Sequence, residues 1–521
     1  MVGLKQVVRY GFEKVEDWFD AIFGPDWNPF FHLGALGWFF YWIVAVSGLY
    51  LYIFFDTGVV QAYESVEALT HSQWYAGGVM RSLHRYASDA LVVVMLMHLL
   101  REFALDRFRG HRWFAWLTGI PLLWFVYACG VSGYWLVWDK LAQYIAIATS
   151  EWLDSLPLFG KAVAHNFVNS ASLSGRFFTL MVFIHIAVPL ITLFLMWIHI
   201  QRHAQAKVNP PRGLAAGTLG MLVVLSLVYP AVSQGPANLD QVPASVNLDW
   251  FYLAGYPLLD VIGGAQLWMM LIGMTVVLLL LPWLPPQRPQ TVAVVDLDNC
   301  NGCGWCAADC PFSAISMQQR SDGLPFDQEA VVDSQLCMSC GICAGACPTS
   351  TPFRRLKPIS PGIQLPEETI AKLRERTVEA AADLSGEGRI LVFGCGHGVE
   401  LDHLKQPSVA TVQMPCVAML PPSFVDFVIA RHYADGVFIA GCRSGDCHYR
   451  LGDEWMEQRF AGKRDPYLRK RVPRERVVLS WAGPTQAKRC ARELDEFRIR
   501  LRALEPPQGP IQDARHQRRG I

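Results

Sequence analysis

The sequence contains little charge and no recognisable nucleotide-binding fingerprint. Of its 521 residues, 17% are Asp, Glu, Lys or Arg, and 45 basic residues balance 45 acidic ones. With zero net charge, nucleic acid is not an obvious partner of this chain. It shows neither a nicotinamide nor a flavin fingerprint, so chemistry that needs such a cofactor must occur in a partner protein. No signalling domain is apparent either.

Apolar residues are abundant and unevenly distributed. The hydrophobic fraction is 52%, and nearly all the long apolar runs precede residue 285. An amphipathic segment at 4–23 is too charged to be a signal peptide and is expected to lie at a membrane interface. Six runs that are long enough to cross a membrane follow it, at 33–55, 79–103, 113–138, 176–200, 214–232 and 265–284.

Two loops between these runs lack basic residues. The loops at 56–77 and 233–264 contain no lysine or arginine, whereas the loops at 101–112 and 201–213 contain several. By the positive-inside rule the basic loops, both termini and everything beyond residue 285 lie in the cytoplasm. We therefore predict an all-α bundle of six transmembrane helices in a prokaryotic cytoplasmic membrane, with the cysteine-rich segments on the reducing side.

Most cysteines fall in a motif that occurs twice. Residues 300–311 and 337–348 both read Cys-x2-Cys-x2-Cys-x3-Cys-Pro. This spacing resembles that of a bacterial two-cluster 4Fe-4S ferredoxin, a small α+β fold in which the fourth cysteine of each motif binds the other cluster. Two zinc knuckles or a disulfide framework are the alternatives, which the repeat with both prolines disfavours. The predicted sets are Cys300, Cys303, Cys306 and Cys347 for one cluster, and Cys337, Cys340, Cys343 and Cys310 for the other.

Four histidines form two matched pairs in the apolar half. His84 and His98 in the second run are fourteen residues apart, and His185 and His199 in the fourth run repeat that interval. Fourteen residues are just under four helical turns, so each helix presents its two histidines on nearly one face, about 21 Å apart. A lone histidine is most simply a packing residue. Two matched pairs instead indicate bis-histidine ligation of an outer haem b by His84 and His185 and of an inner one by His98 and His199.

The first 285 residues resemble cytochrome b of the quinol-oxidising bc complexes. The matching pieces are Trp27-Asn28-Pro29, Gly34, Gly48, Val66-Glu67, Arg81, the His-x3-Pro of His185 and Pro189, and the Gly-Tyr-Trp-Leu-Val-Trp of 133–138. The resemblance implies that Arg81 serves a haem propionate and that Gly34 and Gly48 let a porphyrin edge approach the backbone. It also implies membrane quinone as a reactant and a dimer like that of the bc complexes.

Three side chains are candidates for quinone and proton chemistry. Where the family has Pro-Glu-Trp-Tyr, this chain has Leu248-Asp249-Trp250-Phe251, so Asp249 is either a quinol-proton acceptor or a solvated loop aspartate. His203, after the fourth run, is a candidate for an inner quinone contact or one more positive-inside group. Asp89 in the second run is either a proton carrier or a buried acid paired with Ser88.

The end of the chain alternates strands with helices. Apolar strands are predicted at 390–393, 410–413, 437–440 and 477–480, with helical stretches between them, which indicates a small doubly wound α/β domain. Sites in such sheets gather at the carboxyl ends of the strands. Four thiolates there suit a 2Fe-2S cluster or zinc. The cysteines in question are Cys395, Cys416, Cys442 and Cys447.

Residues 389–505 resemble the iron-sulfur delta subunit of methyl-viologen-reducing hydrogenases. The resemblance is carried by Gly394-Cys395, Pro415-Cys416 and the segment 434–449 with its Gly-Asp-Cys-His-Tyr core. It implies a 2Fe-2S cluster, in preference to zinc or unmetallated thiols, and a flavoprotein partner of the heterodisulfide reductase type. The spacing around Cys395 departs from the family, and His448 is expected to orient its loop.

The chain is thus predicted to be a multidomain fusion with an electron-transfer function. The predicted parts are 1–32 at the membrane interface, 33–284 in the membrane, 285–352 with two 4Fe-4S clusters, 353–388 as a connection, 389–505 with the 2Fe-2S cluster, and a basic tail at 506–521. We expect a subunit of a hetero-oligomeric, quinone-linked oxidoreductase that carries electrons between a cytoplasmic flavoprotein or dehydrogenase and quinone. The alternative is a membrane anchor and relay for a soluble heterodisulfide reductase-like or hydrogenase complex, without quinone chemistry of its own.

Overall fold

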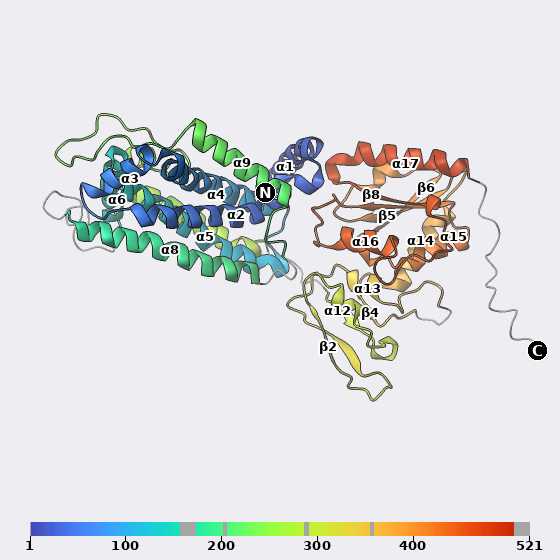
Figure 1. Ribbon diagram of the computed structural model, residues 1–521. Coiled ribbons are helices and arrows are strands. Elements are labelled where there is room, and N and C mark those ends of the chain that lie inside the picture. Colours follow the sequence, from blue (N-terminus) through green and yellow to red (C-terminus); the bar gives the residue numbers. More distant parts are fainter. Residues whose placement is uncertain (1, 157–172, 202–205, 286–290, 355–358, 505–521) are drawn as a thin grey trace, which may run out of the picture. The chain divides into compact units, whose positions relative to one another are not determined.

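The computed structural model describes residues 2–156, 173–201, 206–285, 291–354 and 359–504 (Figure 1). The chain divides into two compact units. One contains Met1–Phe12 and Trp18–Gln287, and the other contains Glu13–Asp17 and Arg288–Ile521. His203 and the basic tail at 506–521 lie outside the described residues. The finer division into six parts stays a prediction.

The first unit is helical. Its helices are α1 (Val2–Phe23), α2 (Leu33–Phe54), α3 (Gln61–His71), α4 (Val79–Ala104), α5 (Trp113–Val137), α6 (Lys140–Asp154), α8 (Gly175–Gln201), α9 (Arg212–Val228), α10 (Tyr256–Ile262) and α11 (Gly264–Leu280). The helices α2 and α4 pack along each other, as do α5 and α8. Large apolar side chains on α8, such as Phe183 and Leu190, remain exposed, as expected of a surface that faces lipid.

Helices that can cross a membrane are present in this unit. Within the described ranges, four are long and apolar enough: Pro29–Phe54, Trp113–Val137, Gly175–Gln201 and Gly264–Trp283. The second and fifth predicted spans, α4 and α9, are not among these four. Charged side chains, including Arg81, Arg85 and Asp89, lower the hydropathy of α4, and α9 has only 17 residues. A transmembrane helical region is thus confirmed, whereas six spans and their orientation stay predictions.

The second unit begins with two small antiparallel sheets. Strand β1 (Val294–Val295) pairs with β4 (Ile363–Gln364), and β2 (Ile315–Gln319) pairs with β3 (Gln328–Val332). Two short helices lie within the cysteine motifs, α12 (Trp305–Ala308) and α13 (Ile342–Ala346). Strand β4 falls in the segment that the sequence predicted as a connection, so this segment contributes a strand to the cysteine-rich part.

A four-stranded parallel sheet forms the rest of this unit. Its strands are β5 (Ile390–Cys395), β6 (Val409–Met414), β7 (Gly436–Gly441) and β8 (Val477–Trp481), in the order β6-β5-β7-β8. The accompanying helices are α14 (Ile370–Ala382), α15 (Ser423–Ala430), α16 (Gly452–Phe460) and α17 (Ala487–Arg502). All four predicted strands are present and the α/β class is confirmed, while the doubly wound topology stays a prediction.

The strands read as continuous apolar runs because both faces of the sheet are covered. Leu391 and Phe393 join a core with α14, α15 and α16, whereas Ile390 and Val392 join a second core with α17 (Figure 1). Alternate side chains of a strand point to opposite faces, so each strand needs apolar residues at every position.

Phe497→Ala should destabilise the α/β part strongly. Phe497 is fully buried in α17, and its ring centre lies 6.2 Å from that of Phe438. Removing a buried phenylalanine ring leaves a cavity and should lower the free energy of unfolding by about 3–5 kcal/mol. The matched control is Ile499→Ala, because Ile499 on the same helix is 66% exposed. Hydrogen exchange of the β5 and β7 amides in the full chain measures the effect, and equal protection in both variants would contradict it.

Candidate functional site

The intramembrane histidines meet between α4 and α8. The ring centres of His84 and His185 are 6.2 Å apart and their planes are inclined by 64°. Two imidazole nitrogens that share one metal ion, each at about 2 Å, would place the ring centres about 6 Å apart. The spacing therefore fits one iron between these two rings. His98 and His199 lie further along the same two helices.

Glycines face the rings of this first pair. A Cβ atom at Gly48 on α2 would lie 2.9 Å from Cε1 of His84, and one at Gly133 on α5 would lie 2.9 Å from Cε1 of His185. Only a residue without Cβ allows such an approach. The predicted importance of Gly48 therefore has a structural cause, although the group that it accommodates directly is the imidazole ring.

The second pair of histidines is also accompanied by glycines, of which Gly119 makes the tighter contact and Gly34 an ordinary van der Waals contact. A Cβ at Gly119 would lie 3.2 Å from Cε1 of His199, and one at Gly34 would lie 3.7 Å from Cε1 of His98. Gly119 was not among the glycines that the sequence analysis predicted to lie beside a haem. The signal was available, because the two glycines on α2 and the two on α5 are each fourteen residues apart, the same interval that separates the histidines on α4 and α8.

Hydroxyl groups hold three of the four rings at Nδ1. The pairs are Ser47 Oγ with His84 at 3.2 Å, Thr118 Oγ1 with His199 at 3.1 Å and Ser132 Oγ with His185 at 3.0 Å. The Val44 carbonyl lies 2.9 Å from Nδ1 of His84 as well. A partner at Nδ1 fixes the ring and leaves Nε2 for a metal, so these residues suit the ligand role. Each of these hydroxyl residues directly precedes a facing glycine in the sequence.

Asp89 and Asp249 meet through a residue that sequence reasoning missed. Nη2 of Arg85 lies 2.7 Å from Oδ2 of Asp249, and Nε of Arg85 lies 3.2 Å from Oδ2 of Asp89. The hydroxyl of Tyr134 donates a hydrogen bond to Asp249, which is only 9% exposed. Asp249 is therefore not a solvated loop residue. The spacing of Arg85 and Asp89, one helical turn apart on α4, was the available signal.

One oxygen of this cluster has no hydrogen-bond partner among the described residues. It is Oδ1 of Asp89, which is buried. The alternative pairing of Asp89 with Ser88 is wrong, because the Ser88 hydroxyl lies 2.6 Å from the hydroxyl of Tyr252 instead. A buried carboxylate oxygen without a donor is costly, which marks this position as a candidate for proton exchange or for contact with a ligand.

Arg81 is buried near this cluster and contacts polar groups of α3 and of the loop that contains Ser233. Its Nη2 lies 2.7 Å from Oγ of Ser233 and its Nη1 lies 3.4 Å from Oε1 of Glu67, while Thr70 also accepts a hydrogen bond from it. The predicted role of Arg81 beside a haem propionate is not tested by these contacts and stays a prediction.

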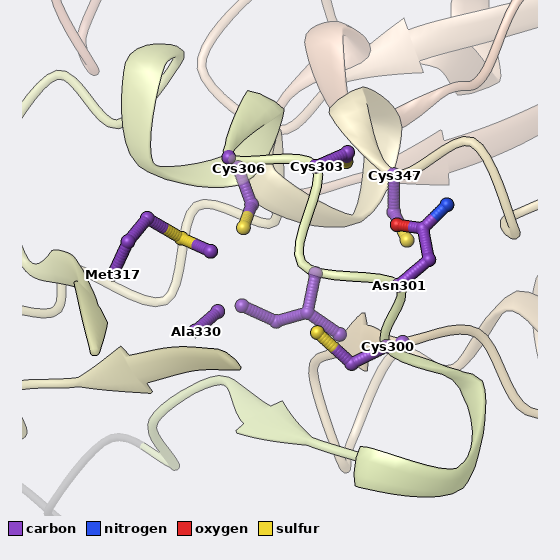
Figure 2. A pocket seen from close by; sticks show the side chains of 10 residues that line it. Cys300, Asn301, Cys303, Cys306, Met317, Ala330 and Cys347 are labelled. Atoms are coloured by element: carbon purple, nitrogen blue, oxygen red, sulfur yellow. The ribbon is translucent and has the colours of Figure 1, made fainter. Parts of the chain in front are cut away.

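Four cysteines line one cavity in the cysteine-rich part (Figure 2). They are Cys300, Cys303 and Cys306 from the first motif and Cys347 from the second. The structure thus brings together the crossed set expected from the spacing. Burial raises the pKa of the Cys306 thiol to about 12, so a bound metal must displace its proton.

The four sulfur atoms of the first set line a cavity and do not converge on a single point. Within the described part of the chain, no three metal-binding side chains are arranged to hold a single metal ion. Zinc needs four thiolates at about 2.3 Å. A cluster of iron and sulfide is wider, so the cavity of the first set fits a cluster better than a zinc ion.

The second predicted set is the more buried of the two. Cys340 and Cys343 are buried, and Cys310 and Cys337 are half-buried. Burial raises the pKa of the Cys340 thiol, and the thiolates of Cys310, Cys337 and Cys447 raise it further. Cys447 belongs to the third predicted set, so a cysteine of that set lies within electrostatic reach of the second.

The third set gathers at the carboxyl ends of β5, β6 and β7. Cys442 interacts with the thiols of Cys395 and Cys447, and Cys447 also interacts with Cys416. The shared hydrogen bonds raise the pKa of Cys416 and lower that of Cys447, so the four side chains form one connected group. Cys395 belongs to this group in spite of the departure of its segment from the family spacing.

Two imidazole rings stack beside this third set. The ring centres of His397 and His448 are 3.6 Å apart and their planes differ by 10°. His448 directly follows Cys447, and Tyr449 packs edge-on against both rings. His397 was not singled out from the sequence. The stack holds the loops after β5 and β7 together, which agrees with the expected orienting role of His448.

Three family models match successive parts of the chain. Residues 20–205 match cytochrome b/b6/petB, residues 299–351 match a 4Fe-4S dicluster domain, and residues 384–505 match the methyl-viologen-reducing hydrogenase, delta subunit. The order agrees with the fusion predicted from the sequence, and the cytochrome match ends at residue 205, before the fifth and sixth predicted spans.

Two individual proteins are similar to the helical part. Cytochrome b6 of Prochlorothrix hollandica is 28% identical over 179 residues, which are 33% of this chain and 80% of that protein. The solved structure "Hyperthermophilic respiratory Complex III" superposes with a TM-score of 0.40 and 19% identity, covering 49% of this chain and 74% of that chain. That superposition is too loose to support an argument about the fold.

Gly48→Ala should disturb the site at His84 selectively. The new Cβ would lie 2.9 Å from Cε1 of His84, and a ring held by a metal and by Ser47 cannot move away. One haem signal should be lost or shifted in optical and electron paramagnetic resonance (EPR) spectra of the purified chain. Gly37→Ala on the same helix is the control, because its Cβ would lie 3.8 Å from Leu91. Identical spectra for both variants would show that His84 does not hold a haem there.

Proposed function

We propose that this chain, which contains a cytochrome b domain, a 4Fe-4S dicluster domain and a hydrogenase delta-subunit domain, is the membrane-bound electron-transfer subunit of a quinone-linked oxidoreductase. It would carry electrons between a cytoplasmic flavoprotein or dehydrogenase and membrane quinone. The observation that supports this best is the buried cluster of Asp249, Arg85 and Asp89, which lies in the same helical unit as the paired histidines.

The redox groups would be held by residues already described. His84 with His185 and His98 with His199 would hold two haems b, and the three cysteine sets would hold two 4Fe-4S clusters and one 2Fe-2S cluster. When bound, these groups supply one-electron transfer. The protein provides fixed ligands, a low-dielectric surrounding and, in the helical unit, buried carboxylates that can accept protons.

Asp249 is suited to accept a proton from a bound quinol. Its carboxylate lies 2.7 Å from Arg85, and the Tyr134 hydroxyl donates a hydrogen bond that holds one carboxylate oxygen in place. Asp89 is bridged to Asp249 by the same guanidinium and has an oxygen without a donor among the described residues. A proton that reaches Asp249 can therefore pass to Asp89 with only small movements.

The charge pattern of the loops supports a membrane location, and the domain composition supports a partner protein. The chain would span the prokaryotic cytoplasmic membrane six times, with both termini and the cysteine sets in the cytoplasm. Its partner would be a flavoprotein of the heterodisulfide reductase type or another dehydrogenase, within a hetero-oligomer that dimerises as the bc complexes do. His203 remains the candidate for a quinone contact on the inner side.

A second candidate function is that of a membrane anchor and relay for a soluble heterodisulfide reductase-like or hydrogenase complex. It is favoured by one observation, the engagement of Asp249 by Arg85 and Tyr134, which occupies the carboxylate within the protein. In this case the cluster is a structural ion pair that lets charged residues lie between helices. Electrons would then leave through a soluble carrier, and quinone would not react.

Asp249→Asn should slow haem reduction by quinol at least about 10²-fold, the usual contribution of a general base. The measurement is a stopped-flow titration of the purified full chain with quinol, followed at the haem absorption bands. Asp240→Asn is the control, because Asp240 is an exposed aspartate of the same loop. A wild-type chain whose haem bands do not respond to quinol would favour the anchor function instead.

Replacement of His98 by alanine should abolish quinone-linked turnover and leave reduction of a soluble dye by the cysteine-containing half intact. The reason is that His98 would hold the haem between the clusters and the quinone end. Steady-state assays with a quinone analogue and with the dye, on the same preparation, separate the two activities. His71→Ala serves as the control, since the His71 side chain is 69% exposed. Equal loss of both activities would contradict the order of transfer.

A further inference from the structure

The cysteine sets of the second unit share one hydrophobic core. Buried cysteines from all three sets belong to it: Cys306, Cys340, Cys343, Cys347, Cys395, Cys416, Cys442 and Cys447. The dicluster part and the sheet part are therefore packed together through a shared apolar core. Within this core, the two predicted 4Fe-4S sets differ in their position relative to the C-terminal set.

The contact is made by the chain segments that carry the cysteines themselves. Helix α13 contains Cys343 and ends directly before Cys347, and the short helix η8 (Val417–Met419) directly follows Cys416. A Cβ at Gly341, which directly follows Cys340 of the second set, would lie 2.7 Å from Sδ of Met419 in η8. A Cβ at Gly345 would lie 2.0 Å from the carbonyl oxygen of Ala418. Glycine is required there because the two backbones touch without a side chain between them.

A second glycine allows the same approach on the other side of η8. A Cβ at Gly452, the first residue of α16, would lie 2.6 Å from Sγ of Cys416 and 3.2 Å from Sγ of Cys447. Ala418 thus lies between the helix of the dicluster part and the sulfurs of the C-terminal set. The spacing between the second and third cysteine sets is set by backbone and small residues.

A buried ion pair connects the same two places. Asp309 directly precedes Cys310 of the second set, and its carboxylate accepts hydrogen bonds from Arg459 and Arg464. Arg459 is fully buried, and its Nη1 donates to the Ala418 carbonyl at 2.8 Å. The indole of Trp455 donates to the backbone carbonyl of Asp309 at 3.1 Å. A buried guanidinium is tolerated only while its partner stays in place, so this pair sets the distance between the two sites.

The first set has a different position in the same unit. Each set has two buried cysteines, Cys306 and Cys347 in the first and Cys340 and Cys343 in the second. The sets differ at Cys303, which is exposed, whereas every cysteine of the second set is buried or half-buried. The rate of electron tunnelling through protein falls off steeply with distance. An exposed site therefore suits electron exchange with a carrier outside this unit, and a buried site suits exchange within the unit.

We propose that the second set, Cys310, Cys337, Cys340 and Cys343, is the direct electron-exchange partner of the C-terminal set. Asp309 and Arg459 are the positioning pair that holds these two sets at a fixed distance. The first set, exposed at Cys303, exchanges electrons with a carrier outside this unit. One electron moves between the two sites, one of which is oxidised as the other is reduced, and no bond is formed or broken. The proposal rests on the proposed electron-transfer function, but its test requires no quinone.

The test is EPR spectroscopy of the dithionite-reduced full chain. Two paramagnetic centres held this close should interact, so the signal of the C-terminal centre should be split or broadened and should relax faster than that of an isolated centre. Cys340→Ser should remove the interaction, and Cys303→Ser should leave it in place. Loss of the interaction in Cys303→Ser with retention in Cys340→Ser would overturn the proposal, as would a wild-type C-terminal signal that shows no interaction.

A second set of variants tests the positioning pair, and this test remains valid if the Cys340→Ser chain does not fold. Arg459→Gln should keep the spin count of every centre but reduce the splitting, and Arg459→Lys, which retains the charge, should recover part of it. Arg469→Gln is the control, since the Arg469 side chain is 55% exposed. An unchanged splitting in Arg459→Gln would refute the positioning role. A chain inactive with quinol but with the splitting intact would refute the proposed function alone.

Discussion

Electrons cross protein only over short distances, and the placement of the candidate redox residues follows from this constraint. In the helical unit, two histidines on each of α4 and α8 put metal-binding nitrogens at two levels of one bundle. In the other unit, three sets of cysteines are packed against a single core. Both arrangements place redox groups near one another by means of regular secondary structure and close packing, not by long loops.

Glycine is the means by which the close packing is achieved. At Gly48 and Gly133 the missing Cβ makes room for an imidazole ring, and at Gly345 it makes room for a neighbouring backbone carbonyl. These contacts occur in parts of the chain with unrelated folds. The common reason is that a side chain at any of these positions would push the candidate ligands apart, and the ligands set the distance over which an electron must travel.

Buried charged groups are joined into networks in both units. Arg85 joins two aspartates within the helical unit, and Arg459 joins Asp309 to the Ala418 carbonyl within the other. Burial of an unpaired charge is costly, so each network is sensitive to the loss of a single member. The networks differ in one respect. That of Arg85 leaves a carboxylate oxygen without a donor among the described residues, which is the property that a proton acceptor needs.

Patterns along the chain determined the broad identity of this protein. The repeated cysteine motif, the fourteen-residue interval of the histidines and the alternation of strands with helices are properties of neighbouring residues, and all three were read from the sequence. The family matches to residues 20–205, 299–351 and 384–505 agree with that interpretation. A motif can be read in this way because the spacing of its ligands is dictated by the local backbone.

Tertiary structure alone decided which distant residues meet. Asp89 and Asp249 are joined by Arg85, Gly119 faces His199, and Asp309 pairs with Arg459. Local spacing points to Gly119 and to the pairing of Arg85 with Asp89, but the long-range partners depend on which elements become neighbours and on how far each is rotated about its axis. The two cysteine motifs could likewise be assigned to clusters from their spacing. That the second set lies beside the third depends on the approach of Gly341, next to Cys340, to Met419 of η8, a contact between segments that are far apart in the chain.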